Sequence, residues 1–241
     1  MLLNFIDMKI ALRSIAAFLL TMVLTVGCNK QEEPISVEDP IDSHTYVDLG
    51  LPSGILWATC NVGADHPEEF GDFFAWGETT PKDIYDWKTY KYCCYIDERY
   101  VLNKYCTDSC YGFNGFVDNL TVLEPIDDAA TVNWGADWRM PTGDEWKELF
   151  ENTTWIWTAQ NDVKGRLMTG PNGNSIFLPA AGYREDCDSV STEVGIYWSS
   201  SLQTTLQVIA WSYHFTFENC HLCGSYERKR GQVVRAVRSE T

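Results

Sequence analysis

From His44 onward the chain consists of short apolar or alternating runs separated by turn-forming residues, a pattern typical of an all-β or α+β domain. The clearest run is "VIAWSYHFTF", residues 208–217, in which apolar and polar residues alternate. This alternation predicts a half-buried antiparallel strand. One face would carry Trp211, Tyr213, Phe215 and Phe217, and the other Ser212, His214 and Thr216. Residues 231–239, "GQVVRAVRS", predict a final strand within reach of pairing with it.

Two other segments predict strands joined by turns. In residues 45–63 a turn at Pro52–Gly54 separates two apolar stretches. In residues 163–182 the run Pro171–Gly173 does the same. Because proline, asparagine and glycine favour the backbone angles of turns, both segments are expected to form strand–turn–strand units.

Only two segments predict helices. Residues 125–135 carry acids near the start and Gly135 at the end, which suits a short helix with a glycine C-cap. In "DWRMPTGDEWKELF", Thr142 and Glu145 have the spacing of a capping box, which predicts that a second helix begins there.

The same stretch, residues 137–150, gathers charges and tryptophans, so it is either a reactive site or a structural corner. The capping box already gives Thr142 and Glu145 a structural role, and Arg139 at the core margin needs a carboxylate or carbonyl partner. We therefore interpret the stretch as a structural corner. Its apolar face would consist of Trp138, Trp146, Leu149 and Phe150.

Length and charge narrow the possibilities further. The chain has 241 residues and no internal repeat, so residues 44–241 are expected to form one domain of the α+β class. The formal net charge of −16 would repel a phosphate backbone. Nucleic acid is therefore excluded as an expected partner.

Residues 1–27 predict a signal peptide. Basic Lys9 and Arg13 precede an apolar run, residues 15–27, that is too short to span a bilayer. The glycine before Cys28 resembles a bacterial lipobox, at which the new N-terminal cysteine is acylated. The sequence therefore predicts lipidation of Cys28, with an ordinary cleaved signal peptide as the alternative.

Residues 28–43 are polar and acidic and contain proline, so they predict an extended tether. Glu32 and Glu33 resemble the export signal of Bacteroidetes lipoproteins, although a merely solvated linker is the alternative. Together these features predict an outer-membrane, lipid-anchored protein that faces the cell exterior.

Six blocks, in order, resemble the major paralogous (FISUMP) domain family of Bacteroidetes and Fibrobacter surface proteins. They are "VDLGLPSGILWATCNVGA", "FGDFFAWGETTPK", "DDAATVNWGADWRMPTGDEW", "GPNGNSIFLPAAGYR", "GIYWSSS" and "VRAVRS". The block "RMPTGDEW" is also similar to the "RLPTEAEW" block of formylglycine-generating enzymes and related sulfatase-modifying-factor domains. These resemblances imply a C-type-lectin-like α+β fold, with antiparallel strands, two short helices and long loops.

The family resemblance implies a surface-exposed lipoprotein with a non-enzymatic binding or structural role. One alternative is an enzyme on the formylglycine-generating scaffold, since Cys220 and Cys223 form a CxxC in the expected loop between the last two strands. Another is a fimbrial or appendage-associated subunit. We assign no catalytic residue and expect no cofactor. The expected partners are outer-membrane lipid through acylated Cys28 and a glycan or surface-protein ligand.

Metal-binding and redox chemistry were weighed at three sets of residues. Disulfides are expected within the Cys93–Cys110 loop or between Cys220 and Cys223, with free thiols or a four-thiolate zinc site (Cys106, Cys110, Cys220 and Cys223) as alternatives. Glu185, Asp186 and Asp188 have oxygens suited to calcium, but a solvated acidic loop is favoured and no metal site is predicted. Four histidines are taken as isolated: His44, His66, His214 and His221.

The segment from Ile84 to Leu120 has no clear period and is rich in aromatic residues. Long loops of this kind are usually functional or disordered, and the aromatic content argues against disorder. We therefore expect this segment to be ordered and to carry the ligand-binding surface. The candidate residues are Trp87, Tyr90, Tyr92, Tyr95 and Tyr100.

Overall fold

The computed structural model describes residues 44–190 and 193–239, which belong to one unit of the chain, residues 42–241. The predicted signal peptide, lipidated Cys28 and acidic tether lie outside the described residues.

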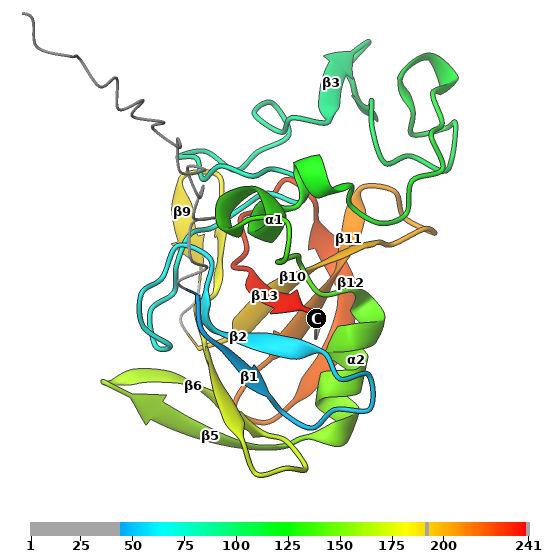
Figure 1. Ribbon diagram of the computed structural model, residues 1–241. Coiled ribbons are helices and arrows are strands. Elements are labelled where there is room, and N and C mark those ends of the chain that lie inside the picture. The colour runs from blue at the N-terminus through cyan, green and yellow to red at the C-terminus, as the bar shows by residue number, and fades with distance from the viewer. Residues whose placement is uncertain (1–43, 191–192, 240–241) are drawn as a thin grey trace, which may run out of the picture. The chain divides into compact units, whose positions relative to one another are not determined.

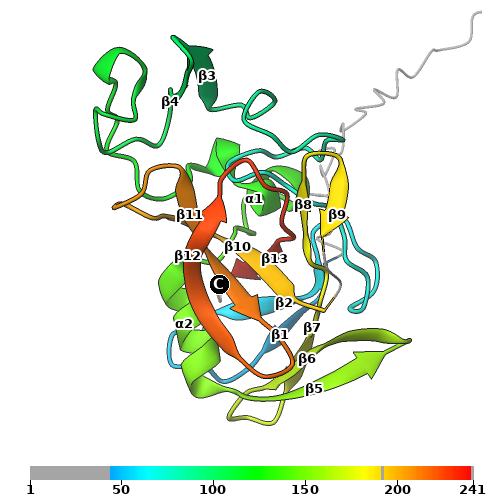
Figure 2. The same cartoon turned by 180° about the vertical axis from the view of Figure 1, so that it is seen from behind.

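The regular structure of the described fold consists mainly of antiparallel strands and two short α-helices, so the fold is of the α+β class, as the sequence predicts (Figures 1 and 2). The strands are β1 (Tyr46–Asp48), β2 (Leu56–Asn61), β3 (Cys93–Ile96), β4 (Arg99–Leu102), β5 (Thr154–Gln160), β6 (Val163–Thr169), β7 (Ser175–Pro179), β8 (Tyr183–Glu185), β9 (Asp188–Val190), β10 (Gly195–Leu202), β11 (Ile209–Phe215), β12 (Cys220–Glu227) and β13 (Arg235–Arg238). The helices are α1 (Ala129–Trp134) and α2 (Gly143–Asn152), with single 3₁₀ turns η1 (Phe113–Gly115) and η2 (Pro125–Asp127).

The sheet β10–β11–β12 packs against α2, and part of the core lies between them (Figure 2). Trp146 of α2 stacks on Tyr213 of β11 with ring centroids 4.8 Å apart and planes 6° apart. Its indole N–H donates to the carbonyl of Trp198 at 3.2 Å. The contact joins the helix face and the strand face that the sequence patterns predict.

The alternation predicted for residues 208–217 holds over most of β11. Tyr213 and Phe215 are buried, but a register shift between Ala210 and Ser212 leaves Trp211 only half-buried. Phe217 lies beyond the end of the strand and is exposed. The prediction is therefore correct for the strand but wrong at three positions, since Trp211 is half-buried, Ser212 is buried and Phe217 is exposed.

The pairing predicted for the last strand is wrong. β13 pairs with β2, and β11 pairs with β10 on one edge and β12 on the other. The segment that contains Cys220 and Cys223 is strand β12 rather than the expected loop. Because β10 and β12 occupy both edges of β11, no edge remains for β13.

Both predicted strand–turn–strand units are confirmed. β1 pairs with β2 beyond a turn in which Gly54 N donates to Leu51 O at 3.0 Å. β6 pairs with β7 across a turn closed by Gly173 N and Gly170 O at 3.0 Å. Gly173 has a φ of +87°, a backbone conformation that glycine adopts without steric cost.

The predicted start of α2 is confirmed, but the helix predicted over residues 125–135 begins only at Ala129, because residues 125–127 form the 3₁₀ turn η2. Asp128 caps α1 by accepting from Thr131 N at 3.0 Å, and Gly135 follows the last turn with a φ of +100°. In α2 the Oγ1 of Thr142 accepts from Glu145 N at 3.2 Å, and the Glu145 carboxylate accepts from Thr142 N at 2.8 Å. The capping box fixes where α2 begins.

Candidate functional site

The segment from Ile84 to Leu120 contains the hairpin β3–β4, near the top of Figure 1. Its two-residue turn is formed by Asp97 and Glu98, whose φ angles are 48° and 62°. Such turns usually contain asparagine or glycine, so this hairpin was not predicted. The expectation of a segment without secondary structure is wrong, because the hairpin organises part of it.

Two of the five predicted ligand-binding residues serve the core instead. Tyr90 is 2% exposed and donates its hydroxyl to the carbonyl of Trp76 at 2.8 Å. Tyr92 is also buried, and its hydroxyl donates to the carboxylate of Asp127. Both side chains attach the segment to the rest of the domain, so neither is available to contact a ligand.

The carboxylate of Asp127 is the centre of this attachment. It is 2% exposed and also accepts from Tyr105 Oη at 2.7 Å, Lys104 Nζ at 2.6 Å and Lys91 Nζ at 3.1 Å. Burial alone would raise the pKa of Asp127, but the hydrogen bonds from Lys104, Tyr92, Tyr105 and Lys91 lower it to about 2. The group is therefore ionised at neutral pH and fully occupied by the segment.

Further contacts hold the rest of the segment. The Asp118 carboxylate accepts from the backbone N–H groups of Tyr105 at 2.7 Å and Cys106 at 2.9 Å. Buried Arg228 donates to the carbonyl of Tyr105 at 3.1 Å, and its guanidinium lies 5.3 Å from the centre of the Trp76 ring. The expectation of an ordered segment is met in these contacts.

The remaining three predicted residues lie together at the surface. Tyr95 and Tyr100 face each other across the β3–β4 hairpin, with ring centroids 4.8 Å apart, and are 59% and 39% exposed. Trp87 is half-buried, with its ring 6.1 Å from that of Tyr100. We call these three side chains the aromatic row. They form a continuous aromatic surface on a segment that Asp127 and Arg228 attach to the rest of the domain.

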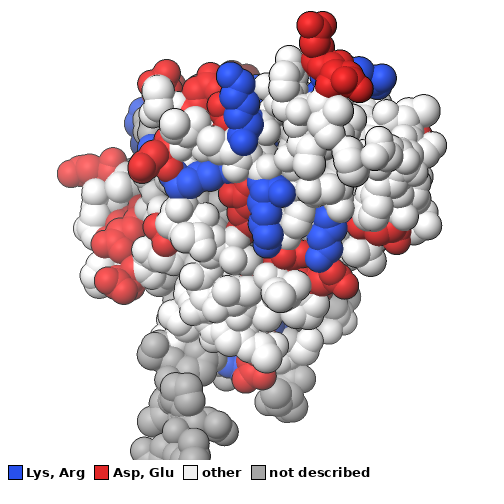
Figure 3. Space-filling model, turned by 90° about the horizontal axis from the view of Figure 1, so that it is seen from above, with Lys and Arg blue, Asp and Glu red and all other residues white. Residues whose placement is uncertain are grey.

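Charged groups border the aromatic row. The indole N–H of Trp87 donates to the carboxylate of Glu227 at 3.3 Å, and Lys229 lies 3.5 Å from the same carboxylate. Lys229 and Arg230 also pair with Glu185, at 3.4 Å and 2.9 Å. Figure 3, which views this side of the domain, shows basic and acidic side chains side by side with uncharged surface between them.

The ion pairs of Glu185 also bear on the acidic loop that was weighed as a calcium site. The carboxylate of Glu185 forms ion pairs with Lys229 and Arg230 and is therefore not a free, solvated acid. Within the described ranges, no group of three or more His, Cys, Asp or Glu side chains is placed to hold a metal ion.

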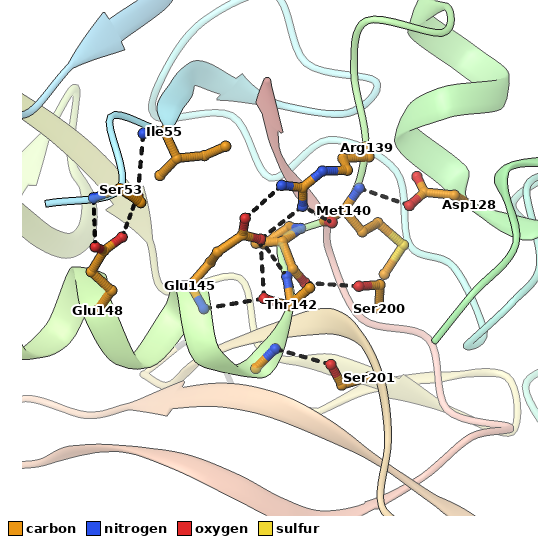
Figure 4. A network of polar contacts seen from close by, with 12 residues as sticks. Ser53, Ile55, Asp128, Arg139, Met140, Thr142, Glu145, Glu148, Ser200 and Ser201 are labelled. Carbon is orange, nitrogen blue, oxygen red and sulfur yellow. Dashed lines mark hydrogen bonds and ion pairs between the residues drawn. The ribbon is translucent and has the colours of Figure 1, made fainter. Parts of the chain in front are cut away.

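The charged stretch at residues 137–150 is a structural corner, as expected (Figure 4). Arg139 donates to both oxygens of Glu145 and to the carbonyl of Met140 at 3.2 Å. Burial alone would raise the pKa of Glu145, but hydrogen bonds from Arg139 and Thr142 lower it. Trp138, Trp146 and Leu149 are buried, and Phe150 packs against the core. Arg139 and Glu145 are thus paired within the corner, whereas Glu148 accepts from Ser53 and Asp137 pairs with Arg238 at 3.5 Å.

The described cysteines are free thiols, so the disulfide expected within the Cys93–Cys110 loop is absent from this part of the structure. Cys93 and Cys94 are neighbours on one strand, which directs their side chains to opposite faces. Cys106 is buried and donates to the carbonyl of Asp108 at 3.1 Å. Cys220 lies half-buried on β12, and the side chain of Cys223 lies outside the description.

The expectation of isolated histidines is wrong for two of the four, His214 and His221. His44 stacks on Trp134 with ring centroids 3.9 Å apart. His214 and His221 lie opposite each other on β11 and β12, with ring centroids 4.9 Å apart. Sequence reasoning missed this pair because it did not predict β12 as a strand.

Comparison of the chain with family models, curated proteins and solved structures found no match. Across residues 44–190 and 193–239, no helix combines the length and the apolar character needed to cross a membrane.

Proposed function

We propose that this protein is a lipid-anchored surface protein of the FISUMP kind, with a C-type-lectin-like domain that binds a carbohydrate through the aromatic row. The observation that carries the proposal is the grouping of Tyr95 and Tyr100, on the β3–β4 hairpin, with Trp87 beside Tyr100. Tyrosine and tryptophan supply large contact areas at a low entropic cost and predominate at binding surfaces.

The chemistry around the row suits a sugar. The apolar faces of a pyranose ring stack on aromatic rings, and its hydroxyls need donors and acceptors nearby. Glu227 and Lys229 supply both beside Trp87. Because Asp127 and Arg228 fix the segment before any ligand arrives, little conformational entropy remains to be lost on binding.

Replacement of Tyr95 and Tyr100 together by alanine is expected to weaken glycan binding by about tenfold or more, because the exposed stacking surface is removed. The measurement is a glycan array of the purified protein, with and without calcium, followed by titration of the best ligand. Phe217→Ala is the matched control, since Phe217 is an exposed aromatic residue, 64% accessible, outside the row. Unchanged affinity in the double variant would place the binding surface elsewhere.

Cys28→Ala is expected to move the protein from the membrane fraction to the soluble fraction, because the acylated cysteine is the proposed anchor. The measurement is fractionation of cells that express the full chain. Cys187→Ala removes an exposed thiol of the domain and should leave the protein with the membranes. The lipoprotein proposal fails if the two variants fractionate alike.

A further inference from the structure

The histidine pair of the β11–β12 hairpin lies outside the aromatic row. His214 and His221 are direct partners in the antiparallel register, so their side chains leave the same face of the sheet. Their ring centroids are 4.9 Å apart, and the ring planes are inclined by 60°. His221 is exposed and His214 is half-buried, so the pair is open on one side.

One nitrogen of this pair lacks a partner. Nδ1 of His214 is buried and has no hydrogen bond within the described part of the chain. A buried polar atom without a partner is costly and needs an explanation. Imidazole nitrogens are common metal ligands.

The spacing of the rings fits bidentate coordination. With metal–nitrogen bonds of about 2.0–2.1 Å and a tetrahedral angle, two imidazole centres on one ion are expected about 5 Å apart. The observed separation is 4.9 Å. The separation of the ring centres thus fits a shared ion.

We propose that His214 and His221 bind one transition-metal ion of the zinc and copper class, with water completing the coordination shell. Imidazole favours these ions over calcium or magnesium, which prefer oxygen ligands. Cys220 is not a ligand, because it pairs with Phe215 on the opposite face, where it interacts with Tyr213. Because His214 lies on β11 and His221 on β12, an ion bound to both would link the two strands and stabilise the hairpin.

The test is a Zn²⁺ titration of the protein, followed by NMR of the imidazole side chains. The chain has only four histidines, so their signals can be assigned, and zinc bound by thiols alone leaves the imidazoles unaffected. The signals of His214 and His221 should shift together and saturate at one equivalent of Zn²⁺. Those of His44 and His66 should not follow, and Ca²⁺ should have no effect. Absence of a joint shift overturns the proposal.

Variants supply the second readout. His221→Gln is expected to weaken the zinc affinity of the imidazole site by about tenfold or more, because one of two ligands is lost. His221 is exposed, so this variant should fold, which circular dichroism verifies. His66→Gln removes another exposed histidine and should bind as the wild type does. Equal zinc affinity in the His221→Gln and wild-type proteins would also overturn the proposal.

Discussion

Trp146→Ala is expected to lower the free energy of unfolding by about 3 to 5 kcal/mol, the range for truncation of a buried tryptophan. Trp146 is fully buried, stacks on Tyr213 and lies 4.8 Å from the ring centre of Trp57. The truncation leaves a cavity between α2 and the central sheet and removes the hydrogen bond to the carbonyl of Trp198. Urea denaturation followed by far-ultraviolet circular dichroism measures the loss.

Thr142→Ala is the control for the same corner. It removes the cap of α2 without creating a cavity in the core, so the free energy of unfolding is expected to fall by only about 0.5 to 2 kcal/mol. A Trp146→Ala protein that unfolds at the wild-type urea concentration, yet no longer binds ligand, would show that the stretch is a binding site and not a structural corner.

The corner could be predicted because its interactions are local in the sequence. Thr142 and Glu145 are three residues apart, and Arg139 finds its carboxylate six residues away. The pattern of polar and apolar positions therefore contains nearly all the information that the structure uses there. The turns at Gly54 and Gly173 were predictable for the same reason, since the residue type fixes the backbone angle.

Strand pairing was not predictable in this way. The β13 sequence can complete any sheet with a free edge, and its neighbour was decided by β12, whose sequence "CHLCGSYE" contains few strand-favouring residues. Once β12 covers the outer edge of β11, β13 is left to pair with β2. One missed strand thus accounts for both the wrong pairing and the unrecognised histidine pair.

The candidate site was predictable as a segment but not residue by residue. Tyr90 and Tyr95 look alike in the sequence, yet Tyr90 is buried and Tyr95 is 59% exposed. What separates them is the hairpin, whose turn at Asp97 and Glu98 lacks the usual glycine, and the carbonyl of Trp76, to which Tyr90 donates. The nearby Tyr92 is held in the same way by the buried carboxylate of Asp127. The partners of Asp127 lie far from it in the chain, so no local pattern indicated them.

Asp127→Ala is expected to lower the free energy of unfolding by about 3 kcal/mol or more, because it removes the buried carboxylate that accepts the hydrogen bonds of the surrounding tyrosines and lysines. The hydroxyls of Tyr92 and Tyr105 would each lose the acceptor of their proton, and Lys104 would keep its ion pair with Glu124, at 2.6 Å. Glu124→Gln is the matched control, since it removes the exposed partner of the same lysine and should cost at most about 1 kcal/mol.

The destabilisation caused by Asp127→Ala should also be confined largely to the segment from Ile84 to Leu120. Without Asp127 the amide groups around Tyr92 and Tyr105 should exchange with solvent faster than those of β10 or β11, because the segment is attached to the domain through this carboxylate. Glycan binding by the aromatic row should weaken in parallel, although no residue of the row is changed. Hydrogen exchange that is uniform across the domain, or equal in Asp127→Ala and wild type, would argue against this role.

The same carboxylate gives the domain a defined response to acid. The pKa of Asp127 is lowered to about 2 in the folded state, against an ordinary value of about 3.9 in an unfolded chain. Its contribution, on the order of 2 kcal/mol, is therefore fully present above about pH 4 and is lost as the pH falls toward 2. Asp127→Asn keeps the shape of the side chain and abolishes this titration, so its unfolding free energy should depend less steeply on pH between 4 and 2. Equal pH slopes in Asp127→Asn and wild type, measured by urea denaturation, would show that the carboxylate does not titrate as the buried centre of this cluster.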